Sequence, residues 1–263
     1  MNAIILAAGQ GTRLKPLTND KPKCLVPLFG KSILEWQLDL FNSFKIKNIS
    51  VVKGYLQEKI TFENIHYFEN SNYDKTNMVE TLFCARDQLF DDVIVSYGDI
   101  IFERNVLQKL LDSKDDISLI IDKNWEKYWK IRFDNPLDDA ETLTIDSNGY
   151  ILDIGQKTSN IEMIQGQYIG LMRFQNDGVK FLRDFYDNAK KIATVNNNPL
   201  NPDIPFEKSY MTDLLWTMVD SGFKIKSIPI TGGWLELDSY DDFIKYENMV
   251  EEKTLSQFFN VEN

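Results

Sequence analysis

Residues 3–18 read Ala-Ile-Ile-Leu-Ala-Ala-Gly-Gln-Gly-Thr-Arg-Leu-Lys-Pro-Leu-Thr, and Lys21-Pro22-Lys23-Cys24-Leu25 follows shortly after. The stretch begins as an apolar run, changes to small residues and glycines, and ends in basic residues broken by prolines. An apolar run bounded by glycine is typical of a buried parallel strand. We therefore expect a strand that leads into a flexible cationic loop suited to a polyphosphate. The alternative interpretation is a solvated basic loop.

The charge of the chain is unevenly distributed. The 263 residues have a formal net charge of −11, yet residues 1–31 contain five basic residues and one acidic residue. This segment therefore carries +4, and the remainder carries −15. Such a balance argues against a general nucleic-acid-binding protein, because phosphate contacts need a basic surface. A local cationic patch in an acidic protein suits a small anionic ligand.

Other features point to the cellular setting. No run approaches 18 apolar residues and the start lacks the basic flank of a signal peptide, so we expect no membrane span and a cytoplasmic location. Cys24 and Cys84 do not make a disulfide framework, and we interpret both as packing residues. His66 is the only histidine. It lies outside every motif, so we expect a structural or surface role.

Apolar periodicity predicts alternating strands and helices up to about residue 121. Strands are expected at 49–52, 65–68, 93–97 and 117–121, and helices at 33–45, 77–89 and around 106–111. Ser32 and Glu35 have the spacing of a capping box before the first helix. This order predicts an α/β fold with a mostly parallel, doubly wound, Rossmann-like sheet.

The pattern changes after Asp122. Asn148-Gly149 between two strand-like segments favours a hairpin, so we expect an antiparallel insertion into the parallel core. Further strands are expected at 141–145, 150–154, 167–174, 225–230 and 234–238, and helices at 177–192, 210–219 and after Ser239. The Asn/Pro-rich segment 195–205 is expected to be a loop, and whether it closes over a substrate stays open.

The glycine pattern of the first loop excludes two common nucleotide sites. Gly9-x-Gly11-x-x-Leu14 lacks the third glycine of a dinucleotide fingerprint, and Pro16 stands where a helix should begin. The P-loop pattern is also missing. What remains is a glycine loop whose backbone N–H groups can face phosphates, with cations close by. Asp99 follows the strand at 93–97, at the sheet edge where open α/β proteins bind ligands.

The segment from Leu6 to Lys23, with LAAGxGTRLxPLT followed by KPK, closely resembles the signature of the sugar-1-phosphate nucleotidyltransferase superfamily. Several downstream segments resemble a narrower branch, the cytidylyltransferases that activate phosphocholine, 2-aminoethylphosphonate or phosphoglutamine. These segments are 73–79, 96–100, Trp125/Trp129/Arg132, 139–142, 167–171, 210–213 and 234–238. The resemblance covers the chain to about Met249, and the tail lies outside it.

The resemblance implies transfer of CMP from CTP to a small phosphorylated or phosphonate amine, with release of pyrophosphate, for decoration of a surface polysaccharide or lipid. The sequence contains no internal repeat or low-complexity tract, so we expect one domain over 1–263. The resemblance implies that 1–122 mainly binds the nucleotide and 123–250 mainly binds the acceptor. It implies catalytic roles for Lys23 and Arg13, which would neutralise the triphosphate. The implied nucleotide-binding residues are Leu6, Ala8, Gly9, Gly11, Thr12, Gly54, Tyr55, Asn77 and Tyr97.

Magnesium is the implied cofactor, with Asp99 and Asp238 as its ligands. Mg²⁺ is a hard ion that suits carboxylates and phosphate oxygens. The alternatives are that Lys23 is a surface lysine, that Asp99 caps a loop, and that Asp238 caps the last helix.

The implied acceptor-binding residues are Trp125, Trp129, Arg132, Glu141 and Tyr168. Together with Tyr128 and Trp234, the aromatic residues would form a cage for an ammonium group. Glu141, Asp139 and Glu236 would add negative charge, and Arg132 would bind the acceptor phosphate bidentately. The alternative is that the aromatic side chains fill a core.

The sequence leaves the function, the acceptor and the oligomeric state open. A sugar-1-phosphate uridylyltransferase or thymidylyltransferase is one alternative function, and a non-catalytic nucleotide-sensing subunit is another. The identity of the acceptor is not determined. The expected partners are CTP and a small phosphorylated acceptor, without nucleic acid or membrane, and a homodimer is compatible with the sequence.

Overall fold

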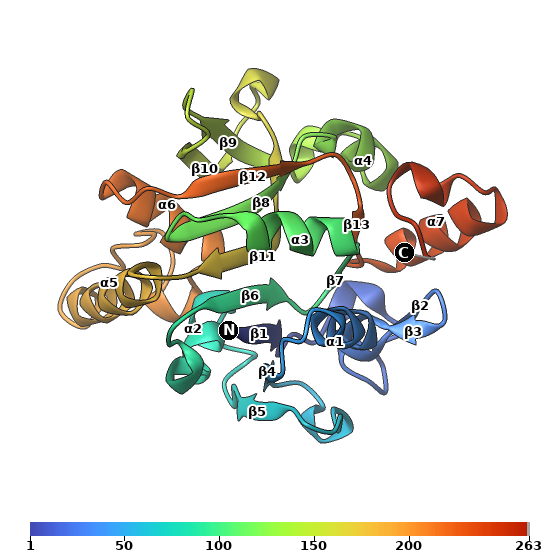
Figure 1. Ribbon diagram of the computed structural model, residues 1–263, viewed down its shortest axis with the longest axis horizontal. Coiled ribbons are helices and arrows are strands. Elements are labelled where there is room, and N and C mark those ends of the chain that lie inside the picture. Colours follow the sequence, from blue (N-terminus) through green and yellow to red (C-terminus); the bar gives the residue numbers. More distant parts are fainter. Residues whose placement is uncertain (262–263) are drawn as a thin grey trace.

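Strand β1 (Asn2–Ala7) lies in the middle of the central sheet of the computed structural model, which describes residues 1–261 (Figure 1). Ala3, Ile4 and Ile5 are fully buried. An apolar run suits this position, because both faces of the strand are covered and only Leu6 is partly exposed. The prediction of a buried amino-terminal strand is confirmed.

The central sheet has seven strands in the order β12-β8-β11-β6-β1-β4-β5. The other six strands are β4 (Asn48–Lys53), β5 (His66–Glu69), β6 (Val93–Tyr97), β8 (Ile117–Asp122), β11 (Gln167–Phe174) and β12 (Lys226–Ile230). Strand β1 pairs in parallel with β4 and β6, β5 pairs in parallel with β4, and β12 with β8. Strand β11 runs antiparallel to both β6 and β8. The predicted mostly parallel sheet with an antiparallel insertion is confirmed.

Three short antiparallel pairs accompany this sheet. They are β9 (Glu141–Ile145) with β10 (Ile151–Lys157), β7 (Ile100–Phe102) with β13 (Trp234–Glu236), and β2 (Pro27–Leu28) with β3 (Lys31–Ser32). The β9–β10 hairpin turns at Gly149, whose φ of 79° is readily available to glycine. The β7–β13 pair joins segments more than 130 residues apart, and it brings the carboxyl-terminal part of the chain to the end of β6.

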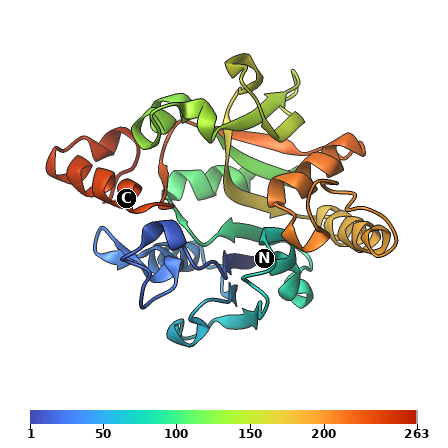
Figure 2. The same ribbon diagram turned by 180° about the vertical axis from the view of Figure 1, so that it is seen from behind.

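Helices cover both faces of the sheet (Figures 1 and 2). One buried apolar cluster contains residues of α1 (Ile33–Ser43), α3 (Arg104–Asp112) and α4 (Trp125–Arg132). The other contains residues of α2 (Met78–Cys84), α5 (Gly178–Ala193) and α6 (Met211–Asp220). Neighbouring residues of β1 belong to different clusters, Ile4 to the second and Ile5 to the first. This alternation is the signature of a strand between two layers, so the doubly wound arrangement is confirmed.

Local signals placed several helix ends correctly. Ser32 and Glu35 form the predicted capping box of α1, and Ser239 caps α7 (Tyr240–Glu251) in the same way with Asp242. The predicted helix at 77–89 was too long at its end. Helix α2 stops at Cys84, and a 3₁₀ turn at Arg86–Gln88 follows, because Ala85 already bonds to the carbonyl three residues back.

Helix α4 was missed by the sequence analysis. Trp125, Tyr128, Trp129 and Arg132 have the spacing i, i+3, i+4, i+7, and all four side chains are buried. That spacing marks one face of a helix. The signal was therefore present, but the crowding of aromatic side chains favoured a binding cage as their interpretation.

Three residues of the tail after Met249 belong to the core, namely Leu255, Phe258 and Phe259. Phe258 packs against Tyr128 of α4, and Phe259 packs against Phe29 and Trp36 near the start of the chain. Both phenylalanine side chains are buried. The tail therefore joins elements from both halves of the sequence. Within residues 1–261, every helix is too short or too polar to cross a membrane.

Candidate active site

The loop after β1 allows Lys23 to approach the end of the strand. Gly11 has a φ of 65°, and a Cβ there would lie 2.8 Å from the Cβ of Lys23. Thr18 donates a hydrogen bond of 2.8 Å to the carbonyl oxygen of Gly11, which fixes the loop. Glycine at position 11 is therefore needed both for the left-handed backbone and for the passage of the lysine side chain.

Lys23 connects two distant carboxylates. Its Nζ donates to Oδ2 of Asp99 at 2.7 Å and to Oδ1 of Asp238 at 2.8 Å. Burial alone would lower the pKa of Lys23, but Asp99 and Asp238 outweigh this effect and raise the pKa above its usual value. The lysine is therefore a largely buried ammonium group whose charge the two carboxylates stabilise. Arg13 pairs with the other oxygen of Asp238 at 2.5 Å.

The turn between β6 and β7 places Asp99. Gly98 donates to the carbonyl oxygen of Leu6 at 2.9 Å, and a Cβ on Gly98 would lie only 2.5 Å from that oxygen. Gln37 of α1 donates to the carbonyl oxygens of Tyr97 and Ile100 on either side of the turn. The turn is thereby held against β1 and α1, so Asp99 has a fixed position at the end of the sheet.

Three carboxylates converge at this point. Oxygen atoms of Asp99, Glu236 and Asp238 lie within 4.8 Å of one another. Oδ1 of Asp99 is buried without a hydrogen-bond partner in the structure. A buried unpaired carboxylate oxygen calls for an explanation, and an all-oxygen donor set is what Mg²⁺ prefers. The residues present therefore fit a hard divalent cation.

Glu236 was assigned to the acceptor by the sequence analysis, and the structure places it with the two aspartates. A signal was available, since Trp234, Glu236 and Asp238 alternate along an extended segment, which puts their side chains on one face. Burial, chiefly, raises the pKa of Glu236 to about 7, while Arg132 opposes the rise and the neighbouring Asp99 adds to it. Burial acts in the same direction on Asp238, but Lys23 and Arg13 hold the pKa of that carboxyl below its usual value.

A cavity of about 160 Å³ opens beside these charges at the carboxyl ends of β1 and β6. Lys23, Asp99 and five of the predicted nucleotide-binding residues line it, namely Leu6, Ala8, Gly9, Asn77 and Tyr97. Its apolar walls come from the strands and from α2, and its charged end comes from Lys23 and Asp99. The cavity therefore offers an apolar surface for a base next to a charged site for phosphates.

The other predicted nucleotide-binding residues lie around this cavity without lining it. The backbone N–H of Tyr55 donates to the carbonyl oxygen of Ala8 at 3.1 Å, and a Cβ on Gly54 would lie 2.7 Å from the same oxygen. Gly54 thus permits close packing behind the wall of the cavity. Gly11 and Thr12 belong to the loop itself, and Thr12 is exposed.

Comparisons with known proteins identify the family of the chain. A model of the MobA-like NTP transferase domain matches residues 3–130. The chain is 40% identical to the CTP:phosphoglutamine cytidylyltransferase of Campylobacter jejuni subsp. jejuni serotype O:2 over 253 residues, which cover 92% of this chain and 97% of that protein. The chain belongs to the nucleotidyltransferase family, in its cytidylyltransferase branch.

Solved structures show the same fold for this cytidylyltransferase. The CTP:phosphocholine cytidylyltransferase from Streptococcus pneumoniae has a TM-score of 0.72 and 20% identity, over 95% of this chain and 98% of that chain. The inositol-1-phosphate CTP transferase from T. maritima has a TM-score of 0.71 and 19% identity, over 98% of this chain and 97% of that chain. At these identities the likeness concerns the fold alone.

The predicted aromatic cage does not form in this cytidylyltransferase. Trp125, Tyr128, Trp129 and Trp234 are each at most 5% exposed and belong to the hydrophobic core. The prediction that Trp125 and Trp129 line the acceptor site is therefore wrong for this structure, because α4 buries them against β13 and the tail. The alternative, that large aromatic side chains fill a core, is the outcome.

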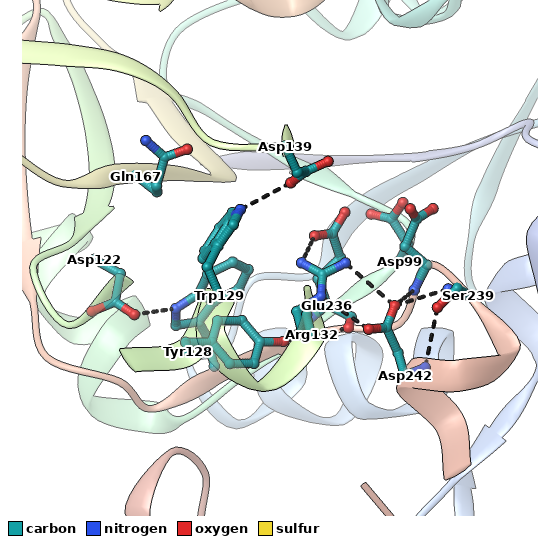
Figure 3. A network of polar contacts seen from close by, with 12 residues as sticks. Asp99, Asp122, Tyr128, Trp129, Arg132, Asp139, Gln167, Glu236, Ser239 and Asp242 are labelled. Atoms are coloured by element: carbon teal, nitrogen blue, oxygen red, sulfur yellow. Dashed lines mark hydrogen bonds and ion pairs between the residues drawn. The ribbon is translucent and has the colours of Figure 1, made fainter. Parts of the chain in front are cut away.

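Arg132 is also engaged. Its guanidinium group pairs with Glu236 at 2.5 Å and with Asp242 at 3.1 Å, and its side chain is 2% exposed (Figure 3). The predicted bidentate binding of an acceptor phosphate is contradicted here, because these carboxylates already occupy the guanidinium group. Burial opposes its charge, but Glu236 and the other neighbours raise the pKa of Arg132 above its usual value, so it remains charged.

Two predicted acceptor residues of the cytidylyltransferase remain partly accessible. Tyr168 packs edge-on against Tyr97 of the cavity, with ring centroids 5.8 Å apart. Burial raises the pKa of Glu141 to about 7, although Lys157 acts in the opposite direction. Close to this region, Asp139 accepts a hydrogen bond of 2.9 Å from Nε1 of Trp129 (Figure 3). Trp129 therefore holds an acidic side chain of the predicted acceptor half, and does so from inside the core.

Proposed function

We propose that this cytidylyltransferase transfers CMP from CTP to a small phosphorylated amine and releases pyrophosphate, with a phosphoglutamine-like compound as the first candidate acceptor. The observation that carries the proposal is the convergence of Asp99 and Asp238 on Lys23, beside a cavity that Lys23 and Asp99 line. The choice of acceptor is supported by the 40% identity to the phosphoglutamine enzyme over most of both chains. The product would serve the decoration of a surface polysaccharide or lipid.

The residues of the chain supply charge neutralisation and positioning. The phosphate of the acceptor is already an anionic nucleophile at neutral pH, so no side chain has to act as a general base. Attack on the α-phosphate builds negative charge, and the Lys23 ammonium group would stabilise it. Arg13 is exposed and close to Asp238, where it can neutralise the departing phosphates. The walls of the cavity would orient the nucleotide for in-line attack.

Asp99, Asp238 and Glu236 would hold Mg²⁺ in this proposal. The ion would neutralise phosphate oxygens and orient the triphosphate. Support comes from the buried unpaired Oδ1 of Asp99 and from the all-carboxylate donor set.

In this proposal the acceptor is selected by acidic residues at the start of β9 and in the loop before it. Glu141 and Asp139 are the acidic residues of this region, and an ammonium group of the acceptor would pair with such carboxylates. Tyr168 beside Tyr97 would provide an aromatic surface near the same position. An acceptor with a primary ammonium group is favoured over a quaternary one, because the tryptophan side chains that would enclose the latter are buried in the core.

Purified protein incubated with each nucleoside triphosphate and each acceptor tests the proposal. We expect pyrophosphate release with CTP and phosphoglutamine above that with phosphocholine or 2-aminoethylphosphonate. Release with dTTP or UTP and glucose-1-phosphate, but not with CTP, would establish the sugar-1-phosphate alternative. Binding of CTP without turnover of any acceptor would favour the nucleotide-sensing alternative.

Removal of divalent cations tests the metal site. We expect turnover to stop in EDTA and to return with Mg²⁺, and Asp99→Asn to raise the concentration of Mg²⁺ that gives half-maximal activity. Full activity in EDTA would remove the metal from the proposal. The cytoplasmic location and a possible homodimer stay predictions.

A further inference from the structure

A buried polar network lies directly behind the three converging carboxylates (Figure 3). Its centre is Arg132 of α4, which bonds Glu236 through Nη1 at 2.5 Å and Asp242 through Nε at 3.1 Å and Nη2 at 3.3 Å. The side chains of Arg132 and Asp242 are 2% and 4% exposed. One buried guanidinium group thus bridges the buried side chain of Asp242 and the partly exposed side chain of Glu236.

The network continues from Asp242 to the backbone of the metal-site segment. Oδ2 of Asp242 accepts hydrogen bonds from the backbone N–H of Asp238 at 3.2 Å and of Ser239 at 2.9 Å. Ser239 in turn accepts from the backbone N–H of Asp242 at 3.1 Å, which completes the cap of α7. The position of the Asp238 main chain therefore depends on the same carboxylate that Arg132 holds.

Two buried phenols hold the main chain of Glu236. The backbone N–H of Glu236 donates to the hydroxyl oxygen of Tyr128 at 2.9 Å, and the hydroxyl of Tyr246 donates to its carbonyl oxygen at 2.7 Å. The two hydroxyl groups also bond each other at 2.5 Å. Buried side chains of α4 and α7 thus hold Glu236 at three points, namely its backbone N–H, its carbonyl oxygen and its carboxylate.

We propose that Arg132 and Tyr128 of α4 are positioning residues that hold Glu236 and Asp238 together in the arrangement that binds the divalent cation. Three carboxylates so close together repel one another, and a flexible set would spread apart. The planar, forked guanidinium group can bond two carboxylates at once, which a lysine ammonium group on its flexible stem does less well. Partners behind metal ligands commonly orient them in this way. The inference rests on the proposed function, since it takes these carboxylates as the cation site.

A purely structural role for Arg132 is the competing explanation, and the chain contains a matched control. Arg173 of β11 is also a buried arginine, and it pairs with Asp92 through Nε and Nη2, each at 2.8 Å. Arg173 lies opposite Ile94, near the start of β6, whereas Asp99 follows the end of β6. Each arginine is thus buried and pairs with one aspartate through Nε and Nη2, but only Arg132 contacts the carboxylate cluster.

Binding of Mn²⁺ alone, followed by electron paramagnetic resonance of the free ion, tests the inference without any substrate. We expect Arg132→Lys to raise the dissociation constant of Mn²⁺ by about tenfold or more. Tyr128→Phe keeps the ring and removes the hydroxyl that bonds the main chain of Glu236 and the hydroxyl of Tyr246, while the Arg132 contacts remain, so we expect a smaller increase. Arg173→Lys should lower the melting temperature and leave the dissociation constant unchanged.

Turnover provides a second measurement. With a positioning role, Arg132→Lys should shift the Mg²⁺ concentration for half-maximal activity upward, and saturating Mg²⁺ should restore most of kcat. A merely structural role would lower the melting temperature, as in Arg173→Lys, without that shift.

The outcomes separate the two levels of the proposal. Equal Mn²⁺ affinity in the wild type and in folded Arg132→Lys would overturn the inference and leave the proposed function intact. If Arg132→Lys does not fold, Tyr128→Phe decides, and unchanged Mn²⁺ affinity in that variant overturns the inference. Failure of the wild type to bind Mn²⁺ or to respond to Mg²⁺ would overturn the metal part of the proposed function, and the inference with it.

Discussion

Nζ of Lys23 lies 2.7 Å from Oδ2 of Asp99, although the two residues are 76 positions apart in the sequence. The same nitrogen reaches Asp238 at 2.8 Å. One ammonium group therefore balances two carboxylates that would otherwise repel each other. The charges that the proposed nucleotidyl transfer would use thus form a mutually stabilised set.

Replacing Lys23 by methionine tests its proposed role in catalysis and its role in balancing the charges of Asp99 and Asp238. We expect kcat to fall by about 10²–10³-fold, because the cation that would stabilise the α-phosphate is lost. We also expect Mg²⁺ to raise the melting temperature of Lys23→Met more than that of the wild type, since the metal then relieves the repulsion between Asp99 and Asp238. Lys180→Met removes an exposed lysine of α5 and is the control for activity. Wild-type turnover in Lys23→Met would rule out the assigned role.

Glu141 predicts a pH dependence of stability. Burial raises its pKa to about 7, and Asp139 and Asp213 add to the effect while Lys157 opposes it. The folded protein keeps the Glu141 proton over a pH range in which the unfolded chain releases it. The resulting contribution to the free energy of unfolding is therefore full below about pH 4.5 and is lost as the pH rises through 7.

Glu141→Gln removes this titration. From pH 5 to pH 8 we expect the variant to gain stability relative to the wild type, by at most about 3 kcal/mol, in urea unfolding. Glu58→Gln changes an exposed carboxylate and should show no such gain. A difference between Glu141→Gln and the wild type that is constant with pH would contradict the prediction.

Two glycines of the site should separate stability from nucleotide binding. Gly98→Ala places a Cβ 2.5 Å from the carbonyl oxygen of Leu6, so we expect a loss of about 1–3 kcal/mol in the free energy of unfolding. A Cβ on Gly9 meets nothing within 4 Å, and Gly9 lines the cavity. Gly9→Ala should therefore keep the stability within about 0.5 kcal/mol and raise the KM for CTP. Denaturant unfolding and steady-state kinetics measure the two effects, and equal stability of the two variants would be evidence against the packing argument.

The carboxyl-terminal tail should contribute to global stability. Phe259 is 2% exposed and contacts Phe29 and Trp36. Phe259→Ala should lower the free energy of unfolding by about 3–5 kcal/mol, the range for a buried phenylalanine. Val261→Ala is the control, since Val261 is exposed. Equal effects of the two substitutions would mean that the tail does not pack as described.

Local sequence patterns were sufficient to predict the features that depend on a few neighbouring residues. The apolar run before Gly9 predicted β1, the Ser32–Glu35 pair predicted the start of α1, and Asn148-Gly149 predicted the β9–β10 hairpin. Periodicity and capping act within one or two turns of chain, so they can be recognised without knowledge of the fold. The position of Asp99 after an apolar strand likewise predicted its place at the end of the sheet.

The tertiary structure decided the roles of the residues whose surroundings come from elsewhere in the chain. Trp129 and Arg132 have side chains suited to either a binding site or a core, and their burial under β13, α7 and the tail placed them in the core. Glu236 joined Asp99 only because β13 pairs with β7. Burial and charge balance are sums over neighbours distant in sequence, so local pattern could identify the chemical groups of this site but not which of them face the substrate and which support it from behind.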